Sequence, residues 1–446
     1  MASPTRFNIG ADETGLLGIK QTPEAAAKLS ALLQEDMEIS HHLLALYGTG
    51  ATPDDIQRGY DDNKTYQLKR NEQGEKALSA LRENYDEATK EFFGRGRYYG
   101  DFLRFYQGEI KEHGYQATVL KYLINNEQNF RRLFGGLLHP YLQLMYGLEW
   151  AQPALVAEGL AQASVHKDAY GELFASVDEK ARKNPPAALR HLADLLDSIG
   201  AEYPHLVAES PHLVAESRWE DGDGSQTAVL NRIPDQVADY LAANVSVSAD
   251  DDFSEQVDSM VHACAYLAAT AIFHPPHKPK FDFFIIHHNN LTPAFIWLKD
   301  QDWIPAAARA RLLEWKLRAG VLTFLSRGSP RLDLEALRRY VPRDVQRGGT
   351  AVRTPEELLP RLHAVPDDGH VIKVARAMLL AQRATRPYLE RAERPAWVRI
   401  ADDETWLKAH YALLDSVEGA DVDSGKEPRW VRSAGFDSAW EDVPKM

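Results

Sequence analysis

Helical periodicity is the feature that most constrains the fold of this chain. Apolar residues recur at three- and four-residue spacings through most of the 446 positions, as in helices that bury one face. Proline opens the segments 23–33 and 153–165, and Thr52-Pro53-Asp54-Asp55 combines a cap, a proline and an acidic first turn. Alternating strand patterns are scarce. The sequence therefore predicts an all-α fold.

Further helical segments cover the rest of the chain. They are 42–47, 75–93, 99–111, 115–126, 185–198, 257–269, 305–326, 355–362, 370–382 and 404–414. No linker is long enough to establish a domain boundary, so we expect one large multi-helix domain over 1–446 with its site between helices. If the domain is divided, we expect the division, or seam, at 203–226. There PHLVAES occurs twice in tandem (204–217), and EDGDGS (220–225) has the composition of a surface loop.

Composition excludes several kinds of partner. The formal net charge is −14, which argues against nucleic acid and against anionic lipid, because both need clustered basic residues. No stretch has the roughly 20 apolar residues of a membrane span, and the first residues lack the apolar core of a signal peptide. The single cysteine, Cys264, allows no intramolecular disulfide and fits a reducing compartment. We therefore expect a cytoplasmic enzyme.

Common catalytic motifs are missing from the sequence. The nearest approach to a dinucleotide fingerprint is Gly48-Thr49-Gly50, but Pro53 stands where the third glycine should be and the segment follows a helical pattern. There is no phosphate-binding Gly-x-x-x-x-Gly-Lys-Ser/Thr loop, no Gly-x-Ser-x-Gly elbow and no His-Glu-x-x-His. The chemistry must use residues that are dispersed along the chain.

Several of the sixteen histidines have apolar surroundings that suit an inward-facing helix position. They are His41, His42, His139, His287, His288 and His370. Neutral imidazole is the commonest ligand of first-row metals, and helix bundles build sites for iron, zinc or copper from such residues. A single histidine beside an apolar run is more often a hydrogen-bonded core residue. The pattern alone leaves both readings open.

Lys373 is an unusual neighbour of these histidines. It lies three residues after His370 in an apolar helical stripe, so both side chains share one helix face. A charged lysine is costly to bury there. Either it extends to water or pairs with a carboxylate, or it is neutral and reactive. Reaction of the neutral amine with CO2 would give a carbamate, an anionic oxygen ligand for a metal.

Several segments together resemble the questin oxidase-like family. They include HHLLALYGTGATPDDIQRGYDDN (41–63), FGGLLHPYLQLMYGLEWAQPALVAEGLAQASVH (134–166), DFFIIHHNN (282–290), DDGHVIKVARAML (367–379) and GFDSAW (435–440). They span almost the whole chain in the family's order, and the block at 134–166 is the most specific. The resemblance implies oxidative cleavage of a ring in an anthraquinone or related aromatic polyketide with O2, in secondary-metabolite biosynthesis.

The resemblance also implies a cofactor and its ligands. Family members have been regarded as NADPH-dependent Baeyer–Villiger monooxygenases, and they also resemble non-haem iron enzymes that use histidines and a carbamylated lysine. In the second view, which agrees with the missing dinucleotide fingerprint, Fe(II) ligands fall on His139 in LLHP, His287 in DFFxxH, and His370 with Lys373 in DGHxxK. The resemblance then implies that His370 and Lys373 are also the catalytic residues.

The N-terminal ligand departs from the family pattern. Family members carry an Asn-His shortly before the equivalent of His41-His42, whereas this chain is shorter there and has Glu38 at the expected position. Glu38, His41 or His42 could substitute. Loss of the ligand would instead suggest a catalytically inactive helical binding protein.

A flat tricyclic substrate would need aromatic side chains to stack against. The candidates are Tyr98, Tyr99, Phe102, Tyr141 and Trp315. Plain core packing is the commoner use of such residues.

Overall fold

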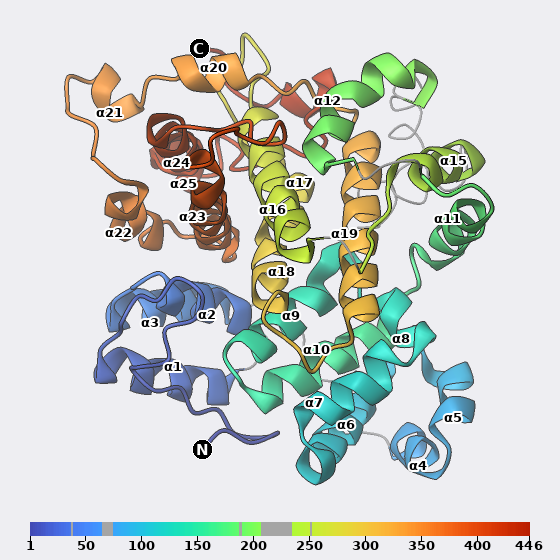
Figure 1. Ribbon diagram of the computed structural model, residues 1–446. Helices are drawn as coiled ribbons and strands as arrows, with labels where there is room; N and C mark the ends of the chain where they lie inside the picture. The colour runs from blue at the N-terminus through green and yellow to red at the C-terminus, as the bar shows by residue number, and fades with distance from the viewer. Residues whose placement is uncertain (37–38, 65–74, 187–189, 207–233, 250–251) are drawn as a thin grey trace. The chain divides into compact units, whose positions relative to one another are not determined.

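The computed structural model describes residues 1–446 except 37–38, 65–74, 187–189, 207–233 and 250–251 (Figure 1). The described residues form helices and no strand, apart from isolated bridges such as the one between Ser3 and Arg6. The predicted all-α class is confirmed. None of the described helices is both long and apolar enough to cross a membrane.

Two compact units make up the chain. Unit 1 contains residues 1–171, 301–305 and 367–369, and unit 2 contains the remainder. A single domain over 1–446 stays a prediction. The seam expected at 203–226 falls mostly outside the described residues, as do the second PHLVAES copy and the EDGDGS segment.

Unit 1 is built from the N-terminal helices. They are α1 (Pro23–Glu35), α2 (Ser40–Gly48), α3 (Pro53–Asn63), α4 (Lys76–Glu83), α5 (Tyr85–Phe92), η1 (Gly96–Tyr98), α6 (Tyr99–His113), α7 (Tyr115–Val119), the π-helical η2 (Leu120–Ile124), α8 (Glu127–Arg132), η3 (Gly136–Leu138), α9 (His139–Glu149) and α10 (Pro153–Val165). Helix α3 begins as its sequence predicts, because Thr52 and Asp55 form a reciprocal capping box.

The helix predicted over 75–93 is in fact two helices. Asn84 adopts an extended conformation (φ −153°, ψ 98°), which ends α4. Its side chain then caps α5 by accepting a hydrogen bond from the Glu87 N–H at 3.3 Å. Asparagine favours this role over a helix interior because its amide competes for backbone groups.

Helices α9 and α10 approach each other closely through glycine. A Cβ added at Gly147 would lie 2.6 Å from the Val156 nitrogen, and one added at Gly159 would lie 2.6 Å from the Leu144 Cα. Any larger side chain at either position would push the two backbones apart. The close contact fixes α9, the helix that begins with His139.

Unit 2 contains the remaining helices. They are α11 (Gly171–Lys183), α12 (Leu192–Glu202), α15 (Pro234–Asn244), α16 (Phe253–Thr270), α17 (Phe283–Asn290), α18 (Thr292–Leu298), α19 (Ala306–Ser326), α20 (Leu334–Arg339), α21 (Arg343–Gln346), η5 (Pro355–Leu358), α22 (Leu359–His363), α23 (His370–Leu389), α24 (Asp403–Val417), α25 (Ala420–Asp423) and η6 (Asp437–Trp440). Helices α16, α17 and α23 pack against one another (Figure 1). The helix expected at 185–198 begins instead at Leu192.

Candidate metal centre

The start of α17 is held by Asp282. One carboxylate oxygen accepts hydrogen bonds from the Phe284 and Ile285 N–H groups at 2.8 and 3.0 Å, and the other accepts from the Ala434 N–H at 2.7 Å. The Phe283 N–H donates to the Val431 carbonyl at 2.8 Å. Burial raises the pKa of Asp282. The first turn of α17 is therefore anchored both to its own cap and to the C-terminal segment.

His287 has a defined protonation pattern. Its Nδ1 lies 2.6 Å from the Phe283 carbonyl oxygen, and a carbonyl can only accept, so Nδ1 carries the hydrogen. The lone pair of the neutral ring is then on Nε2. A backbone carbonyl that fixes the tautomer in this way is the usual support of a metal-binding histidine.

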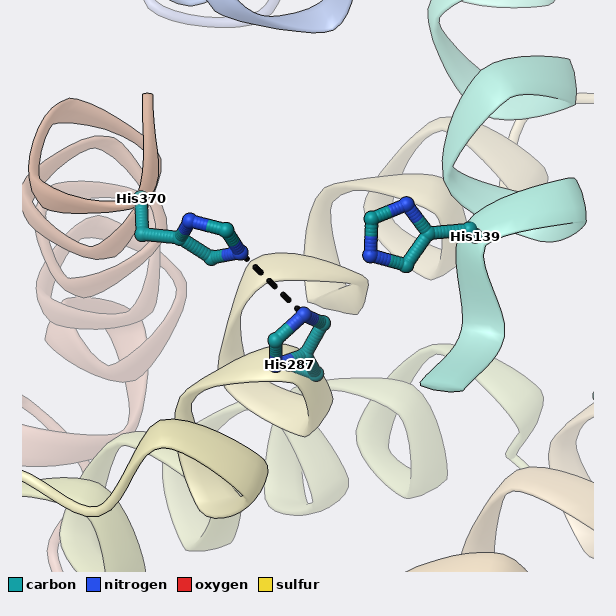
Figure 2. A group of neighbouring side chains, drawn as sticks. All are labelled: His139, His287 and His370. Atoms are coloured by element: carbon teal, nitrogen blue, oxygen red, sulfur yellow. Dashed lines mark hydrogen bonds between the residues drawn. The ribbon is translucent and has the colours of Figure 1, made fainter. Parts of the chain in front are cut away.

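The Nε2 atoms of His287 and His370 face each other at 3.2 Å (Figure 2). His370 is the first residue of α23, and both rings are buried. Two ligand nitrogens that each lie about 2.1 Å from one ion stand roughly 3.0–3.4 Å apart when the angle at the ion is between a right angle and tetrahedral. The pair can therefore share a cation, or a single proton when no cation is bound.

Lys373 lies on α23 three residues after His370 and is 2% exposed. The helix is regular here, so the two side chains share a face, as the spacing indicated. Carbamylation of Lys373 stays a prediction.

His139 is the first residue of α9 in unit 1, and its position is set by an uncommon backbone. The two preceding residues, Leu137 (φ 54°) and Leu138 (φ 69°), are both left-handed. This conformation is disfavoured for leucine, and such strain concentrates at functional sites. The ring of His41, on α2, meets that of His139 edge to face with centroids 5.9 Å apart. Unit 1 thus brings His41 and His139 together.

His42 is enclosed differently from His41. Its Nδ1 lies 3.4 Å from the Asn63 amide nitrogen. A Cβ added at Gly59 would lie 3.1 Å from its ring, and one at Gly369 would lie 2.5 Å from it. These contacts describe a ring packed between two glycine backbones. Glu38, the third candidate for the N-terminal ligand, lies outside the described residues.

Glu158 is a buried carboxylate that the sequence reasoning missed. It lies on α10 with no exposed surface, and it accepts hydrogen bonds from Gln143 Nε2 at 2.6 Å and from the Tyr99 hydroxyl at 3.3 Å. Gln143 is four residues after His139, and its amide also contacts Ser40 Oγ, next to His41. The available signal was one acidic residue in the otherwise apolar stretch 154–161, since a buried carboxylate needs partners.

The proposed stacking residues are mostly part of the core. Phe102 and Trp315 are almost fully buried. Trp315 packs edge to face on Phe174 with centroids 4.9 Å apart, and Phe102 packs near Phe93 and Tyr106. Burial raises the pKa of Tyr141. Tyr99 is half-buried, and its hydroxyl donates a hydrogen bond to Glu158.

The sequence profile described as questin oxidase-like matches residues 38–378. This chain belongs to the questin oxidase-like family. It is similar to the oxidoreductase AflY of Aspergillus parasiticus, with 29% identity over 436 residues that cover 92% of this chain and 84% of the relative. It is 30% identical to a questin oxidase of Aspergillus fumigatus over 415 residues, with coverage of 92% and 88%. It is 27% identical to the Baeyer–Villiger oxidase ptaJ of Pestalotiopsis fici over 468 residues, with both chains fully covered.

These relatives confirm the resemblance found in the sequence and place the chain in a family of oxidoreductases. The matched region includes His139, His287, His370 and Lys373. It ends before the C-terminal residues that anchor α17.

Proposed function

We propose that this chain is an oxygenase that uses O2 to cleave a ring of an anthraquinone or related aromatic polyketide. Ferrous iron would be held by His139, His287, His370 and a carbamylated Lys373. The observation that carries the proposal is that the Nε2 atoms of His287 and His370, both in unit 2, face each other at 3.2 Å (Figure 2). His139 joins this pair through its sequence motif LLHP. Imidazole nitrogens suit ferrous iron, and a few protein ligands leave coordination positions open.

The substrate class is supported by the relatives. A questin oxidase and Baeyer–Villiger oxidases are among them, and a Baeyer–Villiger oxidation inserts oxygen beside a ketone. In a cyclic ketone this insertion weakens the ring for opening. A cyclic aromatic ketone is therefore the substrate class that best fits this chain.

The protein's own residues would prepare the site for this reaction. The Phe283 carbonyl holds the His287 proton on Nδ1 and leaves Nε2 able to coordinate. Glu158 accepts a hydrogen bond from the half-buried Tyr99 hydroxyl and so orients it. Bound iron would supply the one-electron chemistry that allows O2 to react with an organic substrate.

His41 is the better choice for an additional N-terminal ligand. Its ring meets that of His139, whereas the His42 ring packs against Gly59 and Gly369. We therefore assign His42 a packing role and keep His41 as the ligand candidate. Glu38 stays an alternative from the sequence alone.

Metal analysis tests the proposal. Protein purified after growth with added iron should contain close to one iron per chain, and His139→Ala, His287→Ala and His370→Ala should each lose most of it. His113→Ala, which changes an exposed histidine of α6, is the matched control and should retain iron. An active wild-type preparation without stoichiometric metal would refute the iron site.

An NADPH-dependent Baeyer–Villiger monooxygenase is the second candidate. It is favoured by the relative named Baeyer–Villiger monooxygenase AacuH, from Aspergillus aculeatus, which is 27% identical over 430 residues. Turnover under labelled O2 separates the two candidates. A dioxygenase places both labelled atoms in the product, whereas a monooxygenase places one and consumes NADPH in proportion. Retention of both atoms would reject the second candidate.

A further inference from the structure

Asn290 is a buried amide whose polar atoms are unused within the described part of the chain. It is the last residue of α17 and is 1% exposed, and neither Oδ1 nor Nδ2 has a hydrogen-bond partner. Its neighbour Asn289 differs, because its Nδ2 donates to the Val374 carbonyl at 3.3 Å. Buried side-chain amides are nearly always satisfied in folded proteins, so an exception requires an explanation.

The position of Asn290 on α17 relates it to the candidate metal centre. It follows His287 by three residues, and the Leu291 N–H donates to the His287 carbonyl at 3.1 Å, so this turn is helical. Residues three apart lie on the same helix face. The unused amide therefore stands one turn along α17 from the imidazole that faces His370.

The chemistry of the amide defines what it could recognise. A carboxamide offers two N–H donors and one carbonyl acceptor and carries no charge. This set complements a neutral edge on which a carbonyl stands beside a hydroxyl, as on a hydroxylated quinone. A phosphate or carboxylate would instead call for a cationic partner.

We propose that Asn290 recognises the substrate by donating to a ring carbonyl and accepting from the adjacent hydroxyl, which orients the oxygenated ring beside His287. This inference rests on the proposed function, because it assumes an aromatic ketone as the substrate. Asn290 then determines specificity, since analogues without the hydroxyl leave its carbonyl unpaired. A buried water molecule is the competing occupant.

Ligand binding without turnover tests the assignment. Metal-free protein in the absence of O2 is titrated with quinizarin, a hydroxylated anthraquinone, and with unsubstituted anthraquinone, and binding is followed by quenching of tryptophan fluorescence. Asn290→Leu, which keeps the shape and removes the polar atoms, should weaken quinizarin binding on the order of tenfold to a hundredfold. It should weaken the binding of anthraquinone less, because that ligand keeps the ring carbonyl but lacks the hydroxyl.

A matched control is available on α16. Gln256 is also a buried amide with neither polar atom partnered among the described residues. Gln256→Leu should leave both affinities unchanged, which separates substrate recognition from a general effect of removing a buried amide. If Asn290→Leu does not fold, Asn290→Asp provides the second measurement, because it keeps the shape and the acceptor but removes the donors. It should also weaken quinizarin binding.

The outcomes distinguish this inference from the proposed function. If the wild type binds quinizarin and Asn290→Leu binds it equally well, the Asn290 assignment is overturned and the water-filled alternative holds. If the wild type binds neither quinone, the substrate class in the proposed function fails, whatever the variants do. A larger loss of affinity for quinizarin than for anthraquinone supports both.

Discussion

The Nδ1 atom of His287 donates a hydrogen bond to the carbonyl oxygen of Phe283, four residues earlier on the same chain, at 2.6 Å. This hydrogen bond keeps the proton of the neutral ring on Nδ1. The unprotonated Nε2 is the atom that faces His370. A metal bound by His287 should therefore coordinate through Nε2 while Nδ1 keeps its proton. NMR of cobalt-substituted protein should show an exchangeable Nδ1 proton shifted by the metal and absent from His287→Ala. Coordination through Nδ1 would contradict the tautomer.

Replacement of Asp282 by asparagine should loosen the ligand helix. The amide has only one acceptor oxygen, so either the N–H groups of the first turn or the Ala434 N–H loses its partner. We expect urea unfolding to show a loss of about 1–3 kcal/mol, together with weaker iron retention. Asp402→Ala, which removes the cap of α24, is the control and should lower stability by about 1 kcal/mol without releasing iron. Full stability in the Asp282 variant would show that this anchor is dispensable.

A carbamylated Lys373 predicts a specific chemical rescue. Lys373→Ala should lose most iron and activity, because it removes both the anionic ligand and its stem. Added acetate or propionate should restore part of both by entering the space with its carboxylate, whereas sodium chloride should not. Lys408→Ala, on α24, should behave as the wild type with either salt. Equal iron content in Lys373→Ala and wild type would remove the lysine from the ligand set.

The buried ring of His262 should make the protein less stable in mild acid. Burial lowers its pKa from 6.5 to about 3, and its Nε2 accepts from the Arg399 N–H at 2.9 Å. Between these values the unfolded chain binds the proton and the folded chain does not, so stability falls as pH drops below 6.5. From pH 6.5 to pH 5 this one group costs roughly 2 kcal/mol.

His262→Gln tests this prediction through the slope of stability against pH. The variant should be less stable at neutral pH, because it disturbs the hydrogen bonds to Thr385 and Arg399. Its further loss in urea unfolding between neutral pH and pH 5 should be smaller than the wild type's by roughly 2 kcal/mol. An identical pH dependence in the two proteins would mean that His262 can be protonated in the folded state.

Two helical glycines should respond to alanine in opposite ways. Alanine is the better helix former by up to about 1 kcal/mol, and Gly108 of α6 has open space where a Cβ would lie, so Gly108→Ala should stabilise the protein. Gly159→Ala should destabilise it by about 1–3 kcal/mol, because its Cβ would collide with the backbone of α9 at Leu144. Thermal unfolding measures both. A stabilised Gly159 variant would show that α9 and α10 can move apart.

The sequence allowed the helical class and many helix bounds to be predicted, because those features depend on local signals. Thr52 and Pro153 mark helix starts in the structure as they do in the sequence. The helix at 99–111 likewise corresponds to α6. The helix predicted over 75–93 was wrong because Asn84 can end one helix and cap the next, and periodicity continues across it.

The candidate site was only partly accessible from the sequence. Histidine spacing cannot reveal that the nitrogens of His287 and His370 face each other, because residues 83 apart are brought together by packing of α17 on α23. The roles of Glu158 and Asn290 depend on which hydrogen-bond partners tertiary structure supplies or withholds. A sequence motif can identify a candidate ligand, but the hydrogen-bond partners of the surrounding side chains are known only from the tertiary structure.

The residues that anchor the start of α17 make the position of His287 depend on the segment around Val431 and Ala434. Val431 exchanges backbone hydrogen bonds with Phe281 and Phe283, and the Ala434 N–H donates to Asp282, so residues after the matched region 38–378 hold the start of α17. A chain that is cut or terminated before Val431 would keep every proposed ligand. It would still lose the hydrogen bonds that orient α17 and, with it, His287. The orientation of His287 thus depends on a segment around residues 431–434 that lies far from it in the sequence.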